Sequence, residues 1–418
     1  MTKTEKDRFN FLMVERQITA SLAASAALMP KEAMLEVKKQ SKHLYIGIPK
    51  EISFQENRVP LIPESVSLLV NNGHQIVVES GAGAASKIED SDFSEAGAQI
   101  AYSTEEVYKA DIILKVAPPS IEELEYLQHR QTLISILQMS MQNTEYIKAL
   151  SAKKINGIGY EFIHDERGVY PIIQAMSEIV GNSSILIAAE YLSNAFNGKG
   201  ELLGGVAGIP PTSVVIIGAG TVGEYAARAA MGLGAMVKIF DNSIHRLRRL
   251  QNRLGRRVFT SMLVPKILLN ELKTADVAIG ALRASEGRTP IVVTEEMVSE
   301  MRVGSVIVDV SIDQGGCFET SEVTNHLQPV FKKYGVVHYC VPNIASRVSR
   351  TASTALSNIF TQILLSAAEE GGFEEVVWKD LSVRNGVYMY NGAITNRYIA
   401  ETCRLPYKDL DLLRAARM

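Results

Sequence analysis

Short apolar runs alternate with helix-like stretches along most of the chain. The runs are rich in β-branched and aliphatic residues, as buried strands are, and the stretches between them have helical spacing. Strand–helix alternation of this kind predicts parallel sheets covered by helices on both faces. We expect the first strands in "LYIGIPKE", "QIVVES", "DIILKVA", "TLISIL" and "INGIGYEF".

A second alternating series starts at Val214. Before it, "SEIVGNSSILIAAEYLSNAF" predicts a long helix from Ser177, followed by the Gly-rich "GKGELLGGVAGIPP". From Thr351 the pattern becomes helical again and ends in a polar tail. The strands expected in this series are "VVIIGAG", "MVKIFD", "RVFTSM", "DVAIGAL", "VIVDVSI" and "VVHYCVP".

The two series predict an α/β fold of two doubly wound, Rossmann-like domains with parallel sheets, the second inserted in the first. We expect an N-terminal helical extension over 1–43, a discontinuous substrate domain over 44–172 and 350–418, and a dinucleotide-binding domain over 173–349. Functional groups should gather where the carboxyl ends of strands from both domains face one cleft.

Composition narrows the class of protein. The chain has 418 residues, 46% of hydrophobic types, and a net charge of -3, so nothing points to a nucleic-acid partner. Three cysteines without CxxC spacing argue against a disulfide framework or a metal site and fit a reducing, cytoplasmic compartment. No apolar run approaches the roughly 18 residues of a membrane span. "QITASLAASAALMP" is the nearest match to a signal peptide, but polar residues interrupt it.

"VVIIGAGTVGEYAARAA" places Gly218, Gly220 and Gly223 in the GxGxxG spacing. A β-branched strand leads into the loop, and an Ala-rich helix follows it. Glycines let the backbone approach a pyrophosphate, to which the helix N-terminus offers free N–H groups. The alternative is a tight strand–helix turn without a ligand.

Asp241 ends the next strand, about 20 residues after the loop, as the dinucleotide fingerprint requires. Its carboxylate would accept hydrogen bonds from ribose hydroxyls and repel a 2'-phosphate, which favours NAD over NADP. Arg246 either flanks the adenosine or is a solvated helix residue. Because of this arginine, NADP stays an alternative cofactor.

Two later strands should deliver polar groups to the cleft. "SVIVDVSIDQGG" brings Asp313 to a Gly-Gly break, and "VVHYCVPNIA" brings Asn343. We expect the glycines to let the cofactor approach and Asp313 to take part in proton transfer or to orient a reacting group. An aspartate that only forms the turn is the alternative.

The first domain offers two cations. Arg58 lies in "ENRVPLIPE", and its guanidinium can bind a carboxylate through two parallel hydrogen bonds. Lys115 ends "DIILK", where a partly desolvated ammonium can polarise a carbonyl. Taken singly, each could be a surface cation. Together with a dinucleotide site they suggest a small oxo- or amino-acid substrate.

From about Leu44 to its end, the chain resembles the alanine dehydrogenase family, which is related to the NAD-binding component of proton-translocating transhydrogenase. "IDQGGCFE" beside "HYCV" is similar to the alanine dehydrogenase branch in particular. The first 40 or so residues have no counterpart. The supporting stretches are "IGIPKE", "ENRVPLIPESV", "LKVAPP", "AMSEIVG", "GGVAGIPP", "VVIIGAGTVG", "VIVDVSIDQGGCFET", "VHYCVPNI" and "RTASTAL".

The resemblance implies reversible oxidative deamination of L-alanine by NAD to pyruvate and ammonium. It implies that Arg58 and Lys115 hold the substrate and that Asp313 acts in proton transfer. It also implies a homo-oligomer, hexamer or dimer. The residues implied to contact NAD are Ser177, Gly218, Gly220, Gly223, Asp241, Arg246, Leu282, Asn343 and Ile344.

Gln138 is the main departure from the family pattern. A catalytic histidine is expected in a segment like "YLHLA", where this chain reads "ILQMS". An amide can orient a carbonyl but cannot exchange a proton near pH 7. His129, in the turn before this strand, is not expected to substitute. The smaller departures are Ile136 for an aromatic residue, Arg283 for an apolar residue and Glu322 for an arginine.

Four functions therefore stay open. The leading hypothesis is an NAD-dependent dehydrogenase of the alanine dehydrogenase type with Gln138 among its catalytic residues. A changed pocket would instead give an oxidoreductase for another amino or oxo acid. A third possibility is an NAD(H)-binding regulator that has lost catalysis, and a fourth is a transhydrogenase component.

Overall fold

The computed structural model describes residues 42–139, 142–284 and 287–415. The chain separates into two units, 1–41 and Lys42–Met418, and everything below concerns the second. The helical extension expected over 1–43 thus lies outside the described residues, apart from Lys42 and His43, which are not helical.

Eight strands of the described chain form the first sheet, in the order β15-β14-β6-β5-β4-β1-β2-β3. The six strands β1 to β6 run parallel, and β14 pairs antiparallel with β6 and with β15. The five strands expected here are confirmed, while β3, β14 and β15 were not predicted. The strands are β1 Tyr45–Ile48, β2 Gln75–Glu79, β3 Gln99–Ala101, β4 Ile112–Leu114, β5 Thr132–Ser135, β6 Asn156–Gly159, β14 Val387–Tyr390 and β15 Ala393–Ile394.

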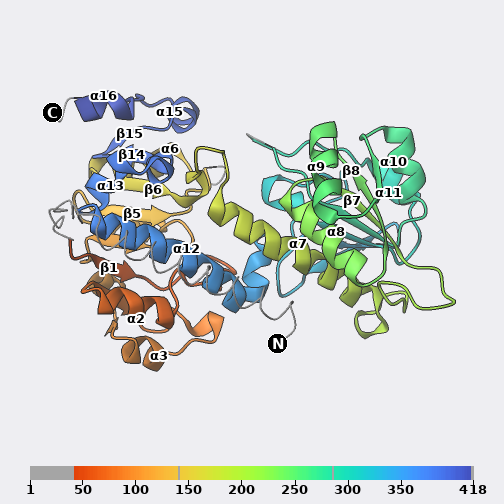
Figure 1. The fold of residues 1–418 in the computed structure, drawn as a ribbon, viewed down its shortest axis with the longest axis horizontal. Helices are drawn as coiled ribbons and strands as arrows, with labels where there is room; N and C mark the ends of the chain where they lie inside the picture. Colours follow the sequence, from red (N-terminus) through yellow and green to blue (C-terminus); the bar gives the residue numbers. More distant parts are fainter. Residues whose placement is uncertain (1–41, 140–141, 285–286, 416–418) are drawn as a thin grey trace, which may run out of the picture. The chain divides into compact units, whose positions relative to one another are not determined.

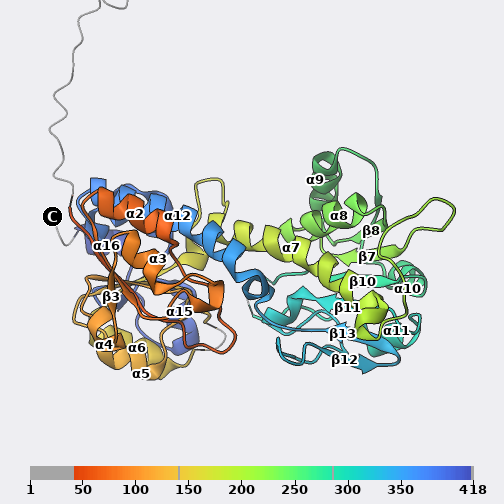
Figure 2. The ribbon, with the colours of Figure 1, turned by 90° about the horizontal axis from the view of Figure 1, so that it is seen from below.

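Helices cover both faces of this sheet, and Figure 2 shows α2 and α12 on one face and α4, α5 and α6 on the other. Two buried apolar clusters lie under them, one with Leu356 and Phe360 of α12 and one with Ile147 of α6. The helices are α2 Pro63–Asn71, α3 Asp90–Glu95, α4 Thr104–Val107, α5 Ile121–Tyr126, α6 Thr144–Ala152, α12 Ser349–Glu369, α13 Phe373–Lys379, α14 Leu381–Asn385, α15 Arg397–Cys403 and α16 Leu410–Ala415.

The second sheet has seven described strands, in the order β12-β13-β11-β10-β7-β8-β9. All pairs are parallel except β12 with β13. The six strands expected in this series are confirmed, and the edge strand β12 was not predicted. The strands are β7 Ser213–Ile217, β8 Met236–Phe240, β9 Phe259–Ser261, β10 Val277–Gly280, β11 Val306–Asp309, β12 Val330–Lys333 and β13 Val336–Tyr339.

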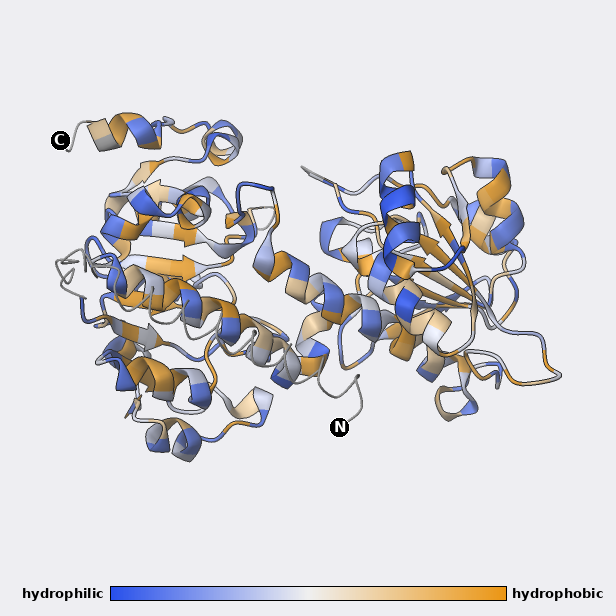
Figure 3. Cartoon of the chain, in the orientation of Figure 1, coloured by the Kyte–Doolittle hydropathy of each residue, from blue (hydrophilic) through white to orange (hydrophobic). Residues whose placement is uncertain are grey.

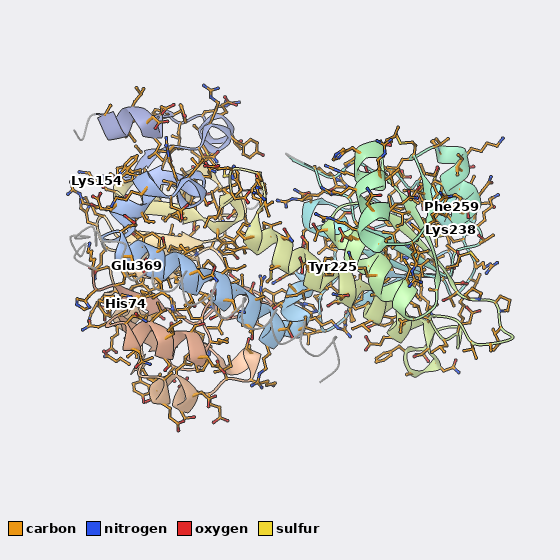
Figure 4. The ribbon with its side chains drawn as sticks, in the orientation of Figure 1. His74, Lys154, Tyr225, Lys238, Phe259 and Glu369 are labelled. Atoms are coloured by element: carbon orange, nitrogen blue, oxygen red, sulfur yellow. The ribbon has the colours of Figure 1, made fainter. Side chains whose placement is uncertain are left out.

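A long apolar helix, α7 Pro171–Leu192, precedes this sheet and begins six residues before the expected start at Ser177. By length and composition it could cross a membrane, but it packs along α8 instead (Figure 1). A Cβ on Gly181 would lie 2.8 Å from the Cβ of Tyr225, so the absence of a side chain permits the close approach (Figure 4). The other helices are α8 Thr221–Gly232, α9 Ile244–Leu254, α10 Pro265–Leu272 and α11 Glu295–Ser299.

The hydropathy of the chain follows this architecture. Figure 3 shows apolar strands, and helices with one apolar and one polar side. The pattern is the one that a doubly wound sheet requires, since both of its faces are covered. Two Rossmann-like domains are therefore confirmed, and β7 to β13 lie between β6 and β14 in sequence. The exact boundaries after residues 172 and 349 stay a prediction.

The parallel order decides where functional groups lie, because the carboxyl ends of parallel strands share one edge of a sheet. In the first sheet, Lys115 follows β4, Gln138 follows β5 and Glu161 follows β6. In the second sheet, the residues that follow strand ends are Gly218, Asp241, Leu282, Asp313 and Asn343.

Candidate active site

The glycine loop joins β7 to α8 and leaves open space at its turn. Gly218 has a φ of 121°, a conformation that suits only glycine. A Cβ on Gly223 would lie 1.9 Å from the carbonyl oxygen of Gly218, so this glycine is needed for helix packing. A Cβ on Gly220, the N-cap of α8, would meet nothing within 4 Å. These residues fit a pyrophosphate, which would lie over Gly220 at the helix N-terminus.

Asp241 fixes this loop from the end of β8. It is 2% exposed, and its carboxylate accepts hydrogen bonds from the backbone N–H groups of Ala219 at 2.8 Å and Ser243 at 2.7 Å. Each oxygen keeps a lone pair for a ribose hydroxyl. The Nη1 atom of Arg246 lies 4.0 Å from the carboxylate on an exposed side chain. The main chain of Leu282 donates to Ser311, which brings the loops after β10 and β11 together.

The Gly-Gly break after β11 surrounds a different aspartate from the one that we expected. Asp309 is fully buried, and its carboxylate accepts from the N–H groups of Cys317 and Phe318 and from the hydroxyl of Ser321. A Cβ on Gly316, which has a φ of 80°, would lie 2.8 Å from that carboxylate. The glycine therefore lets the chain fold back over Asp309. Gly316 thus has a packing role, and the approach of a cofactor at this break stays a prediction.

A chain of hydrogen bonds joins the loop after β1 to the dinucleotide half. Arg58 binds Glu56 through two contacts, Nε to Oε1 at 2.7 Å and Nη2 to Oε2 at 2.5 Å. The amide of Asn343 donates to Glu56 at 3.0 Å, and the backbone N–H of Asn343 donates to Asp313 at 3.0 Å. The structure thus brings Arg58, Asn343 and Asp313 together, with Glu56 between them.

The charged groups in this series of hydrogen bonds suit a carboxylate-binding site. Burial alone would lower the pKa of Arg58, but Glu56 raises it above its usual range. The Nη1–Nη2 edge of Arg58 stays available for a second carboxylate. Asp313 keeps exposed surface, yet desolvation by the surrounding protein raises its pKa, against the N–H of Asn343 and the charge of Arg58. A carboxyl with a raised pKa is suited to proton exchange.

Lys115 is fully buried, not partly desolvated as expected. Its Nζ atom lies 2.6 Å from Glu123 and 3.6 Å from Glu51. Burial raises the pKa of Glu51 to about 7, although the charge of Lys115 lowers it. The charge of Glu51 also acts on Arg58, so Glu51 lies near both cations. An ammonium has three donors, and one remains for a substrate oxygen.

Gln138 follows β5 in the left-handed backbone region, with a φ of 52° and an exposed side chain. Its backbone N–H and that of Leu137 donate to Glu161 at 3.1 and 2.8 Å. His129 precedes β5 and lines a surface hollow with Lys42, Asp111 and Arg130 at the opposite end of the strands. The strand separates His129 from Gln138, so this histidine does not reach the position of Gln138.

The remaining expected contacts are less direct. Ser177 is partly buried on α7, next to Met176, whose sulfur accepts from Arg58 Nη1 at 3.5 Å. The side chain of Ile344 packs in the apolar core of the second domain, which leaves mainly its backbone for a ligand. Leu282 is partly buried beside another apolar cluster of that domain.

Sequence reasoning missed the carboxylates that hold the site. Each lies in or beside a stretch that was quoted, at a strand end or in the segment that follows one, and that position was the available signal. The missed residues are Glu51, Glu56, Glu123, Glu161 and Asp309.

Family models match both halves of the chain. The alanine dehydrogenase/PNT N-terminal domain matches residues 47–180, and the C-terminal domain matches residues 184–397. The chain belongs to the alanine dehydrogenase/PNT family. An alanine dehydrogenase of Staphylococcus saprophyticus is 40% identical over 369 residues, which are 88% of this chain and 99% of the relative.

Two solved structures agree with this family membership. An L-alanine dehydrogenase has a TM-score of 0.80 at 36% identity, covering 85% of this chain and 98% of its own. A transhydrogenase from Sinorhizobium meliloti has a TM-score of 0.72 at 25% identity, covering 84% and 99%. The alanine dehydrogenase/PNT fold therefore accounts for most of the described chain.

Replacing Lys115 by Met tests the buried ion pairs. We expect a loss of about 3–5 kcal/mol in the free energy of unfolding at pH ~8.5, since two carboxylates lose their cation. Without Lys115 the pKa of Glu51 in the folded variant rises further above its value in the unfolded chain. A neutral Glu51 does not destabilise the folded variant at low pH, but its ionisation does as pH rises through the folded pKa. The difference in unfolding free energy between wild type and variant should therefore be smaller at pH ~5.5.

Urea denaturation of both proteins at the two pH values measures this loss. Lys148→Met, at an exposed position of α6, is the matched control and should be nearly neutral. An equal loss at both pH values would contradict the proposed coupling between Lys115 and Glu51.

Proposed function

We propose that this protein catalyses the reversible NAD-dependent oxidative deamination of L-alanine to pyruvate and ammonium. One observation carries the proposal: the hydrogen-bonded chain of Arg58, Glu56, Asn343 and Asp313 places a carboxylate-binding edge near a carboxyl with a raised pKa. Relatives named alanine dehydrogenase, about 40% identical over most of the chain, support the same reaction.

The free Nη1–Nη2 edge of Arg58 binds the carboxylate of the substrate. The Nζ atom of Lys115 is buried in this structure, so its surroundings must move before a substrate can reach it. Its remaining N–H donor then binds the oxygen of the oxo acid. Asp313 takes a proton from the substrate nitrogen or from the water that attacks the reacting carbon, whose own hydrogen leaves as a hydride. The amide of Gln138 orients the substrate or a water without exchanging a proton.

The chemistry requires a hydride acceptor, which NAD supplies when it is bound. The loop with Gly218, Gly220 and Gly223 would hold the pyrophosphate, and Asp241 the adenine ribose. Ser177, Arg246, Leu282, Asn343 and Ile344 would line the rest of that site. Preference for NAD over NADP rests on the carboxylate of Asp241, which would repel a 2'-phosphate.

We further propose a homo-oligomer in the cytoplasm, as a hexamer or a dimer. Five large apolar side chains are exposed on α7 and the segment after it, a composition that is common where copies of a chain associate. They are Leu186, Phe196, Leu202, Val206 and Ile209.

A second candidate function is NAD(H) binding without turnover. Gln138 favours it, because removal of a general acid or base costs on the order of 100- to 10,000-fold in rate. A third is turnover of another amino or oxo acid, since Ile136 and Gln138 change the pocket wall. One assay separates the three candidates.

Oxidation of NADH by the purified chain, with ammonium and a panel of oxo acids, is that assay. We expect turnover with pyruvate and a loss of about 100- to 10,000-fold in Asp313→Asn, which cannot exchange the proton. Asp111→Asn, on an exposed side chain at the other end of the strands, should stay near wild type. NADH binding without turnover of any oxo acid would select the non-catalytic function.

A pair of glycine variants tests the dinucleotide loop. Gly220→Ala meets no protein atom and keeps an ordinary φ of -79°, so the melting temperature should stay unchanged. Its methyl group would lie where the pyrophosphate passes, and we expect NADH affinity to fall by about tenfold or more. Gly223→Ala should lower the melting temperature itself. An unchanged NADH affinity of Gly220→Ala, measured by fluorescence titration, would mean that the nucleotide binds elsewhere.

Gln138→His restores a proton-exchanging side chain at a φ that histidine tolerates better than most residues. We expect a higher deamination rate and a new pH dependence near the imidazole pKa of about 6.5. Gln128→His, at the amino end of the same strand, is the control. An unchanged rate and pH profile would remove position 138 from the proton path.

A further inference from the structure

Glu161 holds the backbone on which Gln138 lies. It belongs to the 3-10 turn Tyr160–Phe162, directly after β6. Its Oε1 atom accepts the backbone N–H groups of Leu137 at 2.8 Å and Gln138 at 3.1 Å. Gln138 adopts the left-handed conformation, which non-glycine residues keep only where the surroundings impose it. The carboxylate of Glu161 is a part of the surroundings that does so.

The second oxygen of Glu161 is buried, and so are the phenol oxygens of two tyrosines on which its charge acts. Among the described residues, Oε2 has no hydrogen-bonding partner, and neither do the phenol oxygens of Tyr146 on α6 and Tyr388 on β14. Burial is the main cause of the raised pKa of both phenols. The charge of Glu161 comes next for Tyr388, and for Tyr146 it acts after Tyr388 and Glu123. The three oxygens therefore share one polar neighbourhood inside the first domain.

The ionisation of Glu161 is finely balanced. Burial raises its pKa to about 7, against the three backbone N–H groups that lower it. The charge of Arg283, in the loop after β10, lowers it as well. The titratable groups that it acts on are Tyr146, Tyr388 and its neighbour Tyr160. The carboxyl would therefore change its charge near neutral pH.

We propose that Glu161 is a positioning residue for Gln138, and that loss of its proton tightens both backbone hydrogen bonds and so sets the pocket for reaction. An ionised carboxylate accepts hydrogen bonds roughly twice as strongly as a neutral group. The proton leaves to solvent and is not passed to the substrate. The inference rests on the proposed function only for its kinetic test.

The kinetic test compares the pH dependence of kcat for alanine in wild type, Glu161→Gln and Glu145→Gln. Glu145 is an exposed residue of α6 and provides the matched control. We expect kcat of the wild type to rise with an apparent pKa near 7. Glu161→Gln should lose this limb and about tenfold of kcat at high pH, while KM changes little. An unaltered limb in Glu161→Gln would overturn the proposal.

A second test needs no turnover. The folded pKa of Glu161 lies above the unfolded value, so its stabilising contribution is present at low pH and lost as pH rises through about 7. The melting temperature of the wild type should therefore fall relative to Glu161→Gln between pH ~5 and ~8.5. A constant difference would contradict the assigned ionisation. If the protein does not turn over alanine, the proposed function is wrong. The melting-temperature test still decides whether Glu161 ionises as proposed.

Tyr388→Phe replaces Glu161→Gln if that variant does not fold. The phenol has no partner among the described residues, so its removal should leave the fold intact. Removing it makes the surroundings of Oε2 less polar, and we expect the kinetic limb to move to higher pH. A limb that stays in place would count against the proposal.

Discussion

The site depends on the carboxylate of Glu56. Its two oxygens bind the guanidinium of Arg58 and also accept the amide of Asn343, so one buried group joins the loop after β1 to the segment after β13. Asn57 supports the joint by donating to Ser346 at 2.7 Å. Removal of either charge would leave the other buried without its counter-ion, which is costly. Charge pairing thus fixes where Arg58 and Asn343 lie before any substrate arrives.

Carboxylates at strand ends serve two purposes in this fold. Asp241, Asp309 and Glu161 each accept at least two backbone N–H groups, which ties down the loops around them. Asp313 accepts one backbone N–H and keeps exposed surface. Fewer bonds and exposed surface leave the oxygens of Asp313 accessible to a substrate. The pattern of hydrogen bonds therefore separates the loop-fixing acids from the acid proposed to react.

The sequence predicted the fold well because buried parallel strands form long apolar runs at regular intervals. It missed β3, β12, β14 and β15, which are short strands or lie at or near sheet edges, where the apolar pattern is weaker. The glycine loop and its aspartate were readable because their spacing is local. The partners of Arg58 and Lys115 were not, since ion pairing is settled only when separate strand ends meet. The packing of Gly316 against Asp309 was not predicted for the same reason.

Gln138 shows why backbone and side chain need separate consideration. Its side chain is exposed, whereas its backbone is held in a strained conformation by the buried carboxylate of Glu161. Burial of that carboxylate carries a desolvation cost, which raises its pKa. Such a cost is easier to understand if position 138 contacts a ligand. The held backbone thus favours an active site at Gln138, as the proposed function requires.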